Sequence, residues 1–206
     1  MRNSAIILSG GASKRFGTDK GLVEFLEKPL ILHVRDRVAP LVDEVLIVLS
    51  SEIQLKKYRG IIESSKLIVD EHDLQAPIIG ALAGFKNALG DYSILLSCDT
   101  PLISQEIVSL LLDLASGNDA IIPRWPNGYM EPLQAVYRTK TTYNAALEAV
   151  KNGKLRLSNM IEGLQKILYI STIALQSLDP NLNTFLNVNT QLELKKAENI
   201  IKSQKT

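Results

Sequence analysis

Short apolar runs alternate with helical patterns along the first two thirds of this chain, and this alternation limits the possible folds more than any other feature. Five runs are rich in β-branched residues and flanked by turn residues: 4–9, 44–50, 66–70, 92–99 and 119–124. Four helical patterns lie between them: 29–39, 51–60, 78–89 and 104–115. Runs that are apolar throughout indicate strands covered on both faces. We therefore expect right-handed βαβ units in an α/β fold, a three-layer sandwich with a mostly parallel, Rossmann-like sheet.

The last third of the chain has a different pattern. A strand-like stretch at 129–138 follows the turn cluster PRWPNGY. Four further elements are expected after it: helices at 140–151 and about 156–164, a strand at 166–172 and a helix at 190–204. A chain of 206 residues suits one domain, and both parts would contribute to one sheet. We therefore expect a single domain, 1–206.

Composition argues against several classes of partner. The 23 basic and 22 acidic residues leave a net charge of +1, which gives no general attraction for nucleic acid or an acidic membrane surface. No apolar run approaches the ~20 residues of a membrane span, and the N-terminus lacks the apolar core of a secretory signal. The single cysteine, Cys98, excludes an intramolecular disulfide, and we expect it to be a buried small hydrophobe. We therefore expect a cytoplasmic protein with no nucleic-acid or membrane partner.

The stretch AIILSGGASKRFGTDK, residues 5–20, joins an apolar run to glycines and positive charge. It matches neither the P-loop pattern nor the dinucleotide pattern G-x-G-x-x-G. Gly10 and Gly11 would let backbone N–H groups approach an anion, and Lys14, Arg15 and Lys20 would add charge. The phosphates of a nucleotide suit three cations better than one carboxylate does. The alternative is a basic surface loop whose glycines only serve turns.

Ligands of open α/β sheets bind beyond the carboxyl ends of the strands. Here the first strand ends at Ser9, the third at Asp70 and the fourth at Asp99, so we expect the glycine-rich stretch and the two aspartates to meet at one rim. Mg²⁺ binds through one or two carboxylates plus substrate phosphates, which suits Asp99 beside a cationic phosphate loop. The alternatives are that Asp99 caps the next helix and that Asp70 belongs to a solvated acidic loop.

The stretch FLNVNTQLELKKAE, residues 185–198, places two asparagines between an expected strand and a helix. Asn187 and Asn189 would share one strand face, and Thr190 with Glu193 forms a capping-box pattern for the helix. The asparagine amides offer hydrogen-bond donors to a substrate. The alternative is that both asparagines only shape the turn into the helix.

Three of these stretches together resemble one known family, the MobA-like nucleotidyltransferases. LSGGASKRFGTDKGLVEF is similar to its signature L-A-G-G-x-S-x-R-M-G-x-D-K, CDTPLI to its magnesium-aspartate motif, and FLNVNTQLEL to its C-terminal F-x-N-x-N-T-P-x-D-L. The resemblance implies a single nucleotidyltransferase domain of the nucleotide-diphospho-sugar transferase fold, with a nucleotide-binding N-terminal half and a C-terminal part that shapes the acceptor site. It also implies an enzyme that uses GTP and Mg²⁺ to attach GMP to the phosphate of molybdopterin, releasing pyrophosphate.

The resemblance assigns roles by position. The implied GTP-binding residues are Leu8, Ser9, Gly10, Gly11, Lys20, Asp70, Gly80 and Asp99. Catalysis would rest on Arg15, Lys20 and Asp99, with Arg15 on the β- and γ-phosphates and Asp99 also binding Mg²⁺. Ser9 replaces the usual alanine. Gly80 is the remnant of a segment P-G-x-G-P-L-A-G that helps to read the base in relatives and that appears here as LQAPIIGALAG, so guanine preference is less firmly implied than nucleotidyl transfer.

The acceptor site is expected to include Glu131, Arg156, Asn187 and Asn189. Glu131 begins the stretch EPLQAVYR, which also resembles a segment common in the family, and Lys154 and Arg138 offer further charge. The implied partners are GTP and molybdopterin, with transient contacts to other proteins of molybdenum-cofactor biosynthesis and to client molybdoenzymes.

Two alternative functions stay open. One is a sibling transferase, either a CTP-dependent molybdopterin cytidylyltransferase or an enzyme with another phosphorylated acceptor. The other is a non-catalytic nucleotide-binding protein that delivers the cofactor. Arg15, Lys20 and Asp99 together favour an enzyme, because binding alone would not need the metal ligand.

Overall fold

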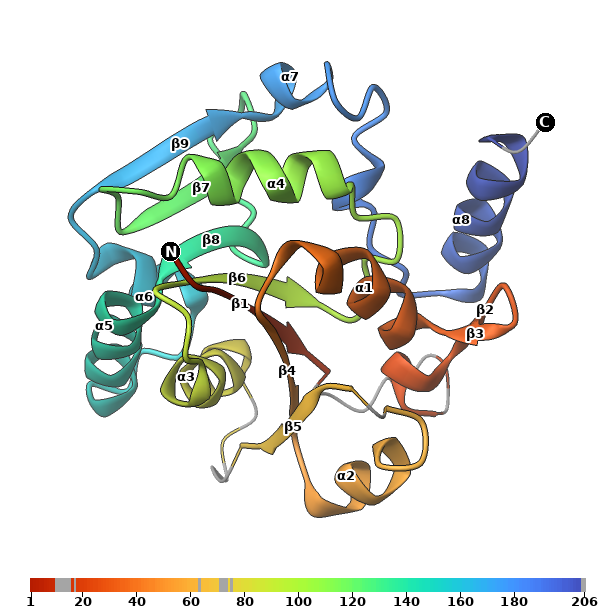
Figure 1. Cartoon of the computed structure of the whole chain (residues 1–206), viewed down its shortest axis with the longest axis horizontal. Coiled ribbons are helices and arrows are strands. Elements are labelled where there is room, and N and C mark those ends of the chain that lie inside the picture. Colours follow the sequence, from red (N-terminus) through yellow and green to blue (C-terminus); the bar gives the residue numbers. More distant parts are fainter. Residues whose placement is uncertain (10–15, 17, 63, 71–73, 75, 205–206) are drawn as a thin grey trace.

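A seven-stranded sheet runs through the middle of the protein (Figure 1). The computed structural model describes residues 1–9, 16, 18–62, 64–70, 74 and 76–204, and within them the strands lie in the order β5-β4-β1-β6-β8-β7-β9. The strand bounds are Asn3–Leu8 (β1), Glu44–Leu49 (β4), Lys66–Val69 (β5), Tyr92–Ser97 (β6), Ala120–Arg124 (β7), Gln134–Arg138 (β8) and Ile167–Ser171 (β9).

The sheet is parallel apart from β8, which pairs antiparallel with β6 and β7. The mostly parallel sheet expected from the sequence is therefore confirmed, and the other six strands end within two residues of their predicted bounds. The prediction for 129–138 is wrong in its first half, because β8 begins only at Gln134. Residues 132 and 133 form a turn, and Pro132 has no N–H to donate to a ladder.

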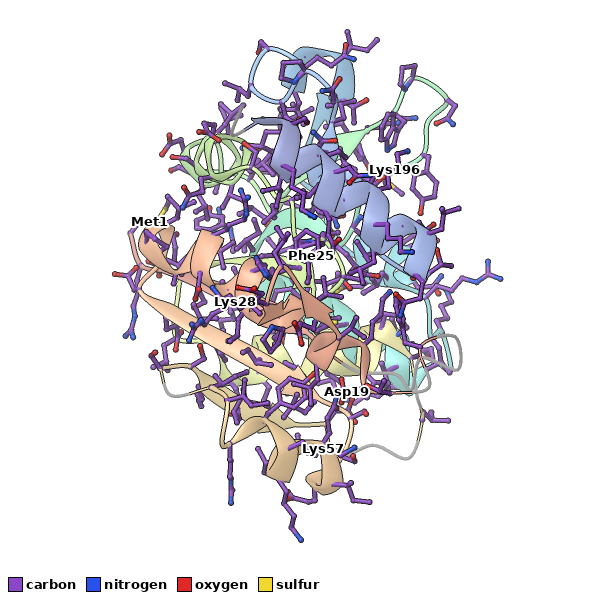
Figure 2. All side chains as sticks on the ribbon, turned by 90° about the vertical axis from the view of Figure 1, so that its right-hand side faces the viewer. Met1, Asp19, Phe25, Lys28, Lys57 and Lys196 are labelled. Atoms are coloured by element: carbon purple, nitrogen blue, oxygen red, sulfur yellow. The ribbon has the colours of Figure 1, made fainter. Side chains whose placement is uncertain are left out.

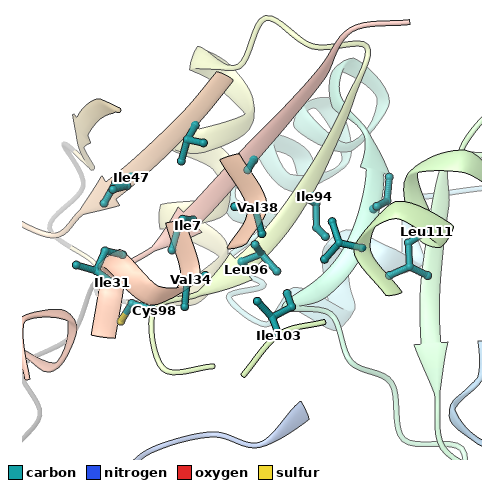
Figure 3. Packing of buried hydrophobic residues seen from close by; sticks show 14 of the residues in the cluster. Ile7, Ile31, Val34, Val38, Ile47, Ile94, Leu96, Cys98, Ile103 and Leu111 are labelled. Atoms are coloured by element: carbon teal, nitrogen blue, oxygen red, sulfur yellow. The ribbon is translucent and has the colours of Figure 1, made fainter. Parts of the chain in front are cut away.

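Helices cover both faces of the sheet and give three layers. The layer on one face holds α1 (Leu30–Val38), α2 (Glu52–Tyr58) and α4 (Gln105–Asp113), and the layer on the other holds α3 (Pro77–Asn87), α5 (Thr139–Lys151) and α6 (Leu157–Glu162). Within β1, Ile7 faces the first layer and Ile6 the second, because side chains alternate along a strand. Figure 3 shows Ile7 and Ile47 of the sheet packed against Ile31 and Val34 of α1.

The remaining helical segments are short, apart from the last. They are η1 (Lys20–Leu22), η2 (Ala39–Leu41), α7 (Thr172–Leu175), η3 (Asn183–Phe185) and α8 (Gln191–Gln204). Within the described residues, every helix falls short of the length and apolar character needed to cross a bilayer.

A hairpin and α8 form a third hydrophobic cluster beside the sheet. β2 (Glu24–Phe25) pairs antiparallel with β3 (Lys28–Pro29), and α8 lies over Phe25 (Figure 2). Phe25 is buried together with Leu194 and Ala197 of α8. The sequence analysis did not predict this hairpin. Because η1 leads into the hairpin and residue 189 leads towards α8, the cluster holds an early and a late segment of the chain close together.

Candidate active site

A pocket of about 310 Å³ opens beyond the carboxyl ends of β1, β4 and β6. It brings together six residues that the sequence analysis named as nucleotide ligands: Leu8, Ser9, Lys20, Asp70, Gly80 and Asp99. The other nucleotide residues named there, Gly10, Gly11, Lys14 and Arg15, lie outside the described residues. The strand-end rule therefore located the rim, and the described part of the predicted set does converge there.

A larger hollow of about 950 Å³ lies at the opposite rim of the sheet, against the start of α5. Arg138 lines this hollow, and its guanidinium lies over the Tyr92 ring and 3.7 Å from the Asp119 carboxylate. The expectation that Arg138 adds charge to the acceptor site is therefore wrong, because an antiparallel β8 carries its carboxyl end away from the pocket. The smaller pocket is lined by the six predicted residues and by both partners of the Lys20–Asp99 ion pair, so we take it as the candidate site.

Lys20 joins three distant parts of the chain at the pocket. Its ammonium group donates to Asp99 Oδ2 in an ion pair and to Asn189 Oδ1 at 2.6 Å. The side chains of Lys20 and Asp99 are only 17% and 13% exposed, so water screens this pair less than a surface pair. The three stretches that carried the family resemblance thus meet in one charged cluster.

Asp99 keeps one carboxylate oxygen available. Its Oδ1 atom is buried and accepts no hydrogen bond from any residue that the structure describes. A buried carboxylate oxygen without a partner is costly, and a bound cation would satisfy it. The described residues contain no cluster of three His, Cys, Asp or Glu that could hold a metal ion by itself. A divalent cation here would therefore combine Asp99 with oxygens of a substrate.

The segment before α8 is anchored beside Asp99. Val188 N donates to the Asp99 carbonyl at 2.8 Å, and the Glu193 carboxylate accepts from Asn189 N at 2.7 Å. This hydrogen bond from the Asn189 backbone is the main reason that the pKa of Glu193 lies below its usual value. Thr190 Oγ1 accepts from Glu193 N at 3.2 Å, so the predicted cap is present. In return, the Glu193 carboxylate accepts from Asn189 N and also from Thr190 Oγ1, the latter at 3.1 Å.

The two asparagines differ in their surroundings. Asn189 contacts Lys20, whereas the side chain of Asn187 is exposed. The segment that carries them follows η3 and is irregular, so the predicted strand before them is wrong. Because Val188 N donates to the Asp99 carbonyl, the segment is attached beside the carboxyl end of β6 and does not form a ladder with a neighbouring strand.

Glu131 lies on the loop between β7 and β8, at the same rim as the pocket. Its carboxylate accepts from Trp125 Nε1 at 2.6 Å, and the Trp125 ring packs edge-on against Phe185 at 5.7 Å. Burial raises the pKa of Glu131, and the Trp125 hydrogen bond opposes that rise. Arg156, in contrast, is exposed at the start of α6 and does not line the pocket.

A second layer of polar residues lies behind Lys20, and the sequence analysis missed it. Asp19 accepts hydrogen bonds from Tyr58 and Gln54 of α2, at 2.8 and 2.7 Å. The only signal in the sequence was the aspartate that precedes Lys20 in the first motif. Cys98 also lies here, and burial raises the pKa of its thiol to about 12. The thiol stays protonated at neutral pH, so the expectation of a buried small hydrophobe is confirmed.

A comparison with known families decides the relationship. The MobA-like NTP transferase domain matches residues 5–167. This chain belongs to that family. A probable molybdenum cofactor guanylyltransferase of Methanosarcina mazei is 31% identical over 204 residues, covering 96% of this chain and 89% of the relative.

Solved structures agree on the fold of this MobA-like protein. Molybdopterin-guanine dinucleotide biosynthesis protein A from Archaeoglobus fulgidus has a TM-score of 0.83 and 27% identity, covering 97% of this chain and 99% of that one. A CMP:2-keto-3-deoxy-manno-octonic acid synthetase complexed with CTP has a TM-score of 0.71 at 16% identity, covering 99% of this chain and 100% of that one. The expected nucleotide-diphospho-sugar transferase fold is confirmed.

Proposed function

We propose that this protein transfers GMP from GTP to the phosphate of molybdopterin, forming molybdopterin-guanine dinucleotide and releasing pyrophosphate. The observation that carries the proposal is the contact of Lys20 with both Asp99 and Asn189 in a pocket at the strand ends. The similarity to proteins named molybdenum cofactor guanylyltransferase over most of the chain supports the choice of reaction.

The reaction needs no general base from the protein. A phosphate monoester has already lost its protons for the most part at neutral pH, so an oxygen of the molybdopterin phosphate can attack the α-phosphorus of GTP directly. A new phosphorus–oxygen bond forms, the bond from the α-phosphorus to the bridging oxygen breaks, and pyrophosphate leaves with its electron pair. The barrier is the approach of two anions and the charge on the leaving group, which positioned cations lower.

Each residue has a role in this scheme. The ammonium group of Lys20, which is ion-paired with Asp99, offers positive charge to the incoming phosphates. Arg15, in its proposed role on the β- and γ-phosphates, adds a second positive charge. Asp99 Oδ1 is the oxygen that suits Mg²⁺, which supplies charge neutralisation on phosphate oxygens when bound. Leu8, Ser9, Asp70 and Gly80 line the space for the nucleoside, and we include Gly10 and Gly11 as donors of backbone N–H groups.

The acceptor would lie towards the loop between β7 and β8. Asn189 Oδ1 is occupied by Lys20, which leaves the two hydrogens of Nδ2 to donate to an anion. Glu131 offers a carboxylate to the N–H groups of a pterin, and we keep Asn187 and Arg156 as outer contacts. Cytoplasmic location and transient contacts with biosynthetic partners and client molybdoenzymes are part of the same proposal.

The test compares thermal stabilisation by GTP, CTP, ATP and UTP, each with and without Mg²⁺, followed by chromatography of the product formed with molybdopterin. We expect GTP with Mg²⁺ to stabilise the protein most and to yield the dinucleotide. Equal or greater stabilisation by CTP would favour the cytidylyltransferase instead. Stabilisation by GTP without any product would favour the non-catalytic carrier.

A further inference from the structure

Asp19 does not line the pocket itself, yet three donors hold its carboxylate. Its Oδ1 accepts from Tyr58 Oη at 2.8 Å and from Gly21 N at 3.1 Å, and its Oδ2 accepts from Gln54 Nε2 at 2.7 Å. Hydrogen bonds to a charged acceptor are stronger than those between neutral groups. The residue directly before Lys20 is therefore fixed from the backbone and from α2.

The same two side chains of α2 also hold Ser9. Gln54 Nε2 donates to the Ser9 carbonyl as well as to Asp19, and Tyr58 Oη lies 2.6 Å from Ser9 Oγ. Gln54 is itself oriented, because its Oε1 accepts from Ser50 N at 2.8 Å. Ser9 precedes and Asp19 follows the glycine-rich stretch of the sequence. Tyr58 and Gln54 thus each join the residue before that stretch to the residue after it.

The hydrogen-bond directions in this cluster are settled by proton count. Tyr58 has one hydroxyl proton, and it goes to Asp19, because an ionised carboxylate can only accept. Ser9 must therefore donate its own hydroxyl proton to Tyr58 Oη. Tyr58 is fully buried, and burial raises the pKa of its phenol, so this direction holds throughout the neutral range. Ser9 can then only accept hydrogen bonds from a molecule in the pocket.

We propose that Tyr58 and Gln54 are positioning residues of this enzyme: by clamping Asp19 to Ser9, they place the Lys20 ammonium against Asp99 and Asn189. The inference rests on the proposed function, since it gives Lys20 its task on the triphosphate. Lys20 belongs to a 3₁₀ turn of only three residues, whose N-cap is Asp19. Such a turn cannot fix a long side chain by its own backbone bonds, so the clamp supplies the rigidity.

The main test is Tyr58→Phe, which removes a single oxygen. Its control is Tyr92→Phe, because Tyr92 is 5% exposed and donates its hydroxyl to the Asn118 carbonyl at the far end of β6 from Asp99. We expect Tyr58→Phe to lower kcat/KM for the nucleotide by about ten- to a hundred-fold, the cost of a misplaced reacting group. Tyr92→Phe should keep the wild-type kcat/KM. Equal kinetics in the two variants would overturn the proposal.

A double-mutant cycle separates positioning from a structural role. In a Lys20→Ala background, Tyr58→Phe should cause no further loss of nucleotide affinity, measured by calorimetry, because the group it positions is gone. Losses that multiply would show that Tyr58 acts by another route and would refute the inference. If Tyr58→Phe does not fold, Asp19→Asn takes its place. That change keeps the size of residue 19 but turns an N–H₂ group towards a Gln54 donor.

A failure of the positioning role of Tyr58 can be told apart from a failure of the proposed guanylyl transfer. Every comparison uses the nucleoside triphosphate that stabilises the wild-type protein most, with Mg²⁺. If this is CTP, the guanylyl proposal fails, while the ratio between Tyr58→Phe and wild type still decides the clamp. If GTP is used and Tyr58→Phe matches wild type, only the clamp fails.

Discussion

Gly21 offers a sharp test of the geometry behind Lys20. This glycine is buried directly after Lys20, and an added Cβ would lie 2.2 Å from Tyr58 Oη and 2.4 Å from Ser9 Oγ. Both distances are more than ~1 Å below the optimum for two non-bonded heavy atoms. Neither oxygen can move away freely, because the two are hydrogen-bonded to each other at 2.6 Å and Tyr58 also donates a hydrogen bond to Asp19.

The expected cost of Gly21→Ala has two parts. Overpacking a close-packed site costs about 1–3 kcal/mol. Breaking one of the buried hydrogen bonds that link Ser9, Tyr58 and Asp19 costs about 1–3 kcal/mol more. We therefore expect the free energy of unfolding to fall by about 2–6 kcal/mol. The nucleotide-dependent rise in thermal midpoint should also shrink, because Lys20 moves with its neighbour.

Gly60→Ala is the matched control, since nothing lies within 4 Å of its added Cβ and its backbone conformation is open to alanine. It should be neutral or stabilising by about 0.4–1 kcal/mol through the unfolded state. Urea unfolding at constant m-value measures both variants. A Gly21→Ala protein as stable as Gly60→Ala would show that Tyr58 and Ser9 do not lie where the structure puts them.

Three further predictions concern the pocket and its supports. Asp99→Ala should abolish product formation and leave the circular dichroism spectrum unchanged, and near-wild-type Mg²⁺-dependent turnover would contradict its metal role. Asn189→Ala should impair dinucleotide formation more than Asn187→Ala, because only Asn189 contacts Lys20; equal effects in a paired chromatographic assay would count against this. His33 donates a hydrogen bond from Nε2–H to the Phe25 carbonyl at 2.6 Å, and burial lowers the pKa of its imidazole. As the pH falls, the imidazole of the unfolded chain is therefore protonated before that of the folded protein. The free energy of unfolding should consequently decrease as the pH drops below about 6.5. His33→Gln should weaken the dependence of the urea midpoint on pH between about pH 7 and 5. An unchanged slope of the midpoint against pH would exclude His33 as the cause.

The sheet was predictable from the sequence because its strands are apolar on both faces and bounded by turn residues. The hairpin was not, because its two-residue turn is Leu26-Glu27, with φ of 49° and 62° at the two positions. Such turns usually carry Asn or Gly, and neither occurs here. A run of two residues per strand also carries too little alternation to be noticed. Packing under α8 holds this hairpin in place, and no local pattern reports such packing.

The pocket was predictable in outline because strand ends gather at one rim. Its second layer was not. Tyr58 and Gln54 lie in an amphipathic helix, where a buried tyrosine is indistinguishable by pattern from any other core residue. Their contact with Asp19 joins residues 39 and 35 positions apart, so only the folded chain shows it. Arg138 and Asn187 were misplaced for a related reason, since one antiparallel strand and one irregular segment changed where they point.

The bond between Lys20 and Asn189 spans 169 positions, while the last strand of the sheet ends at Ser171. During synthesis, all seven strands of the large sheet have left the ribosome's catalytic centre before Asn189 is joined to the chain. The sheet can therefore pair its strands while Lys20 still lacks its amide partner. A nascent or prematurely ended chain that stops before residue 189 would keep the strand layer but have an incomplete charged cluster. In this protein, the order of translation completes the charged cluster of the site only after every strand of the sheet has been made.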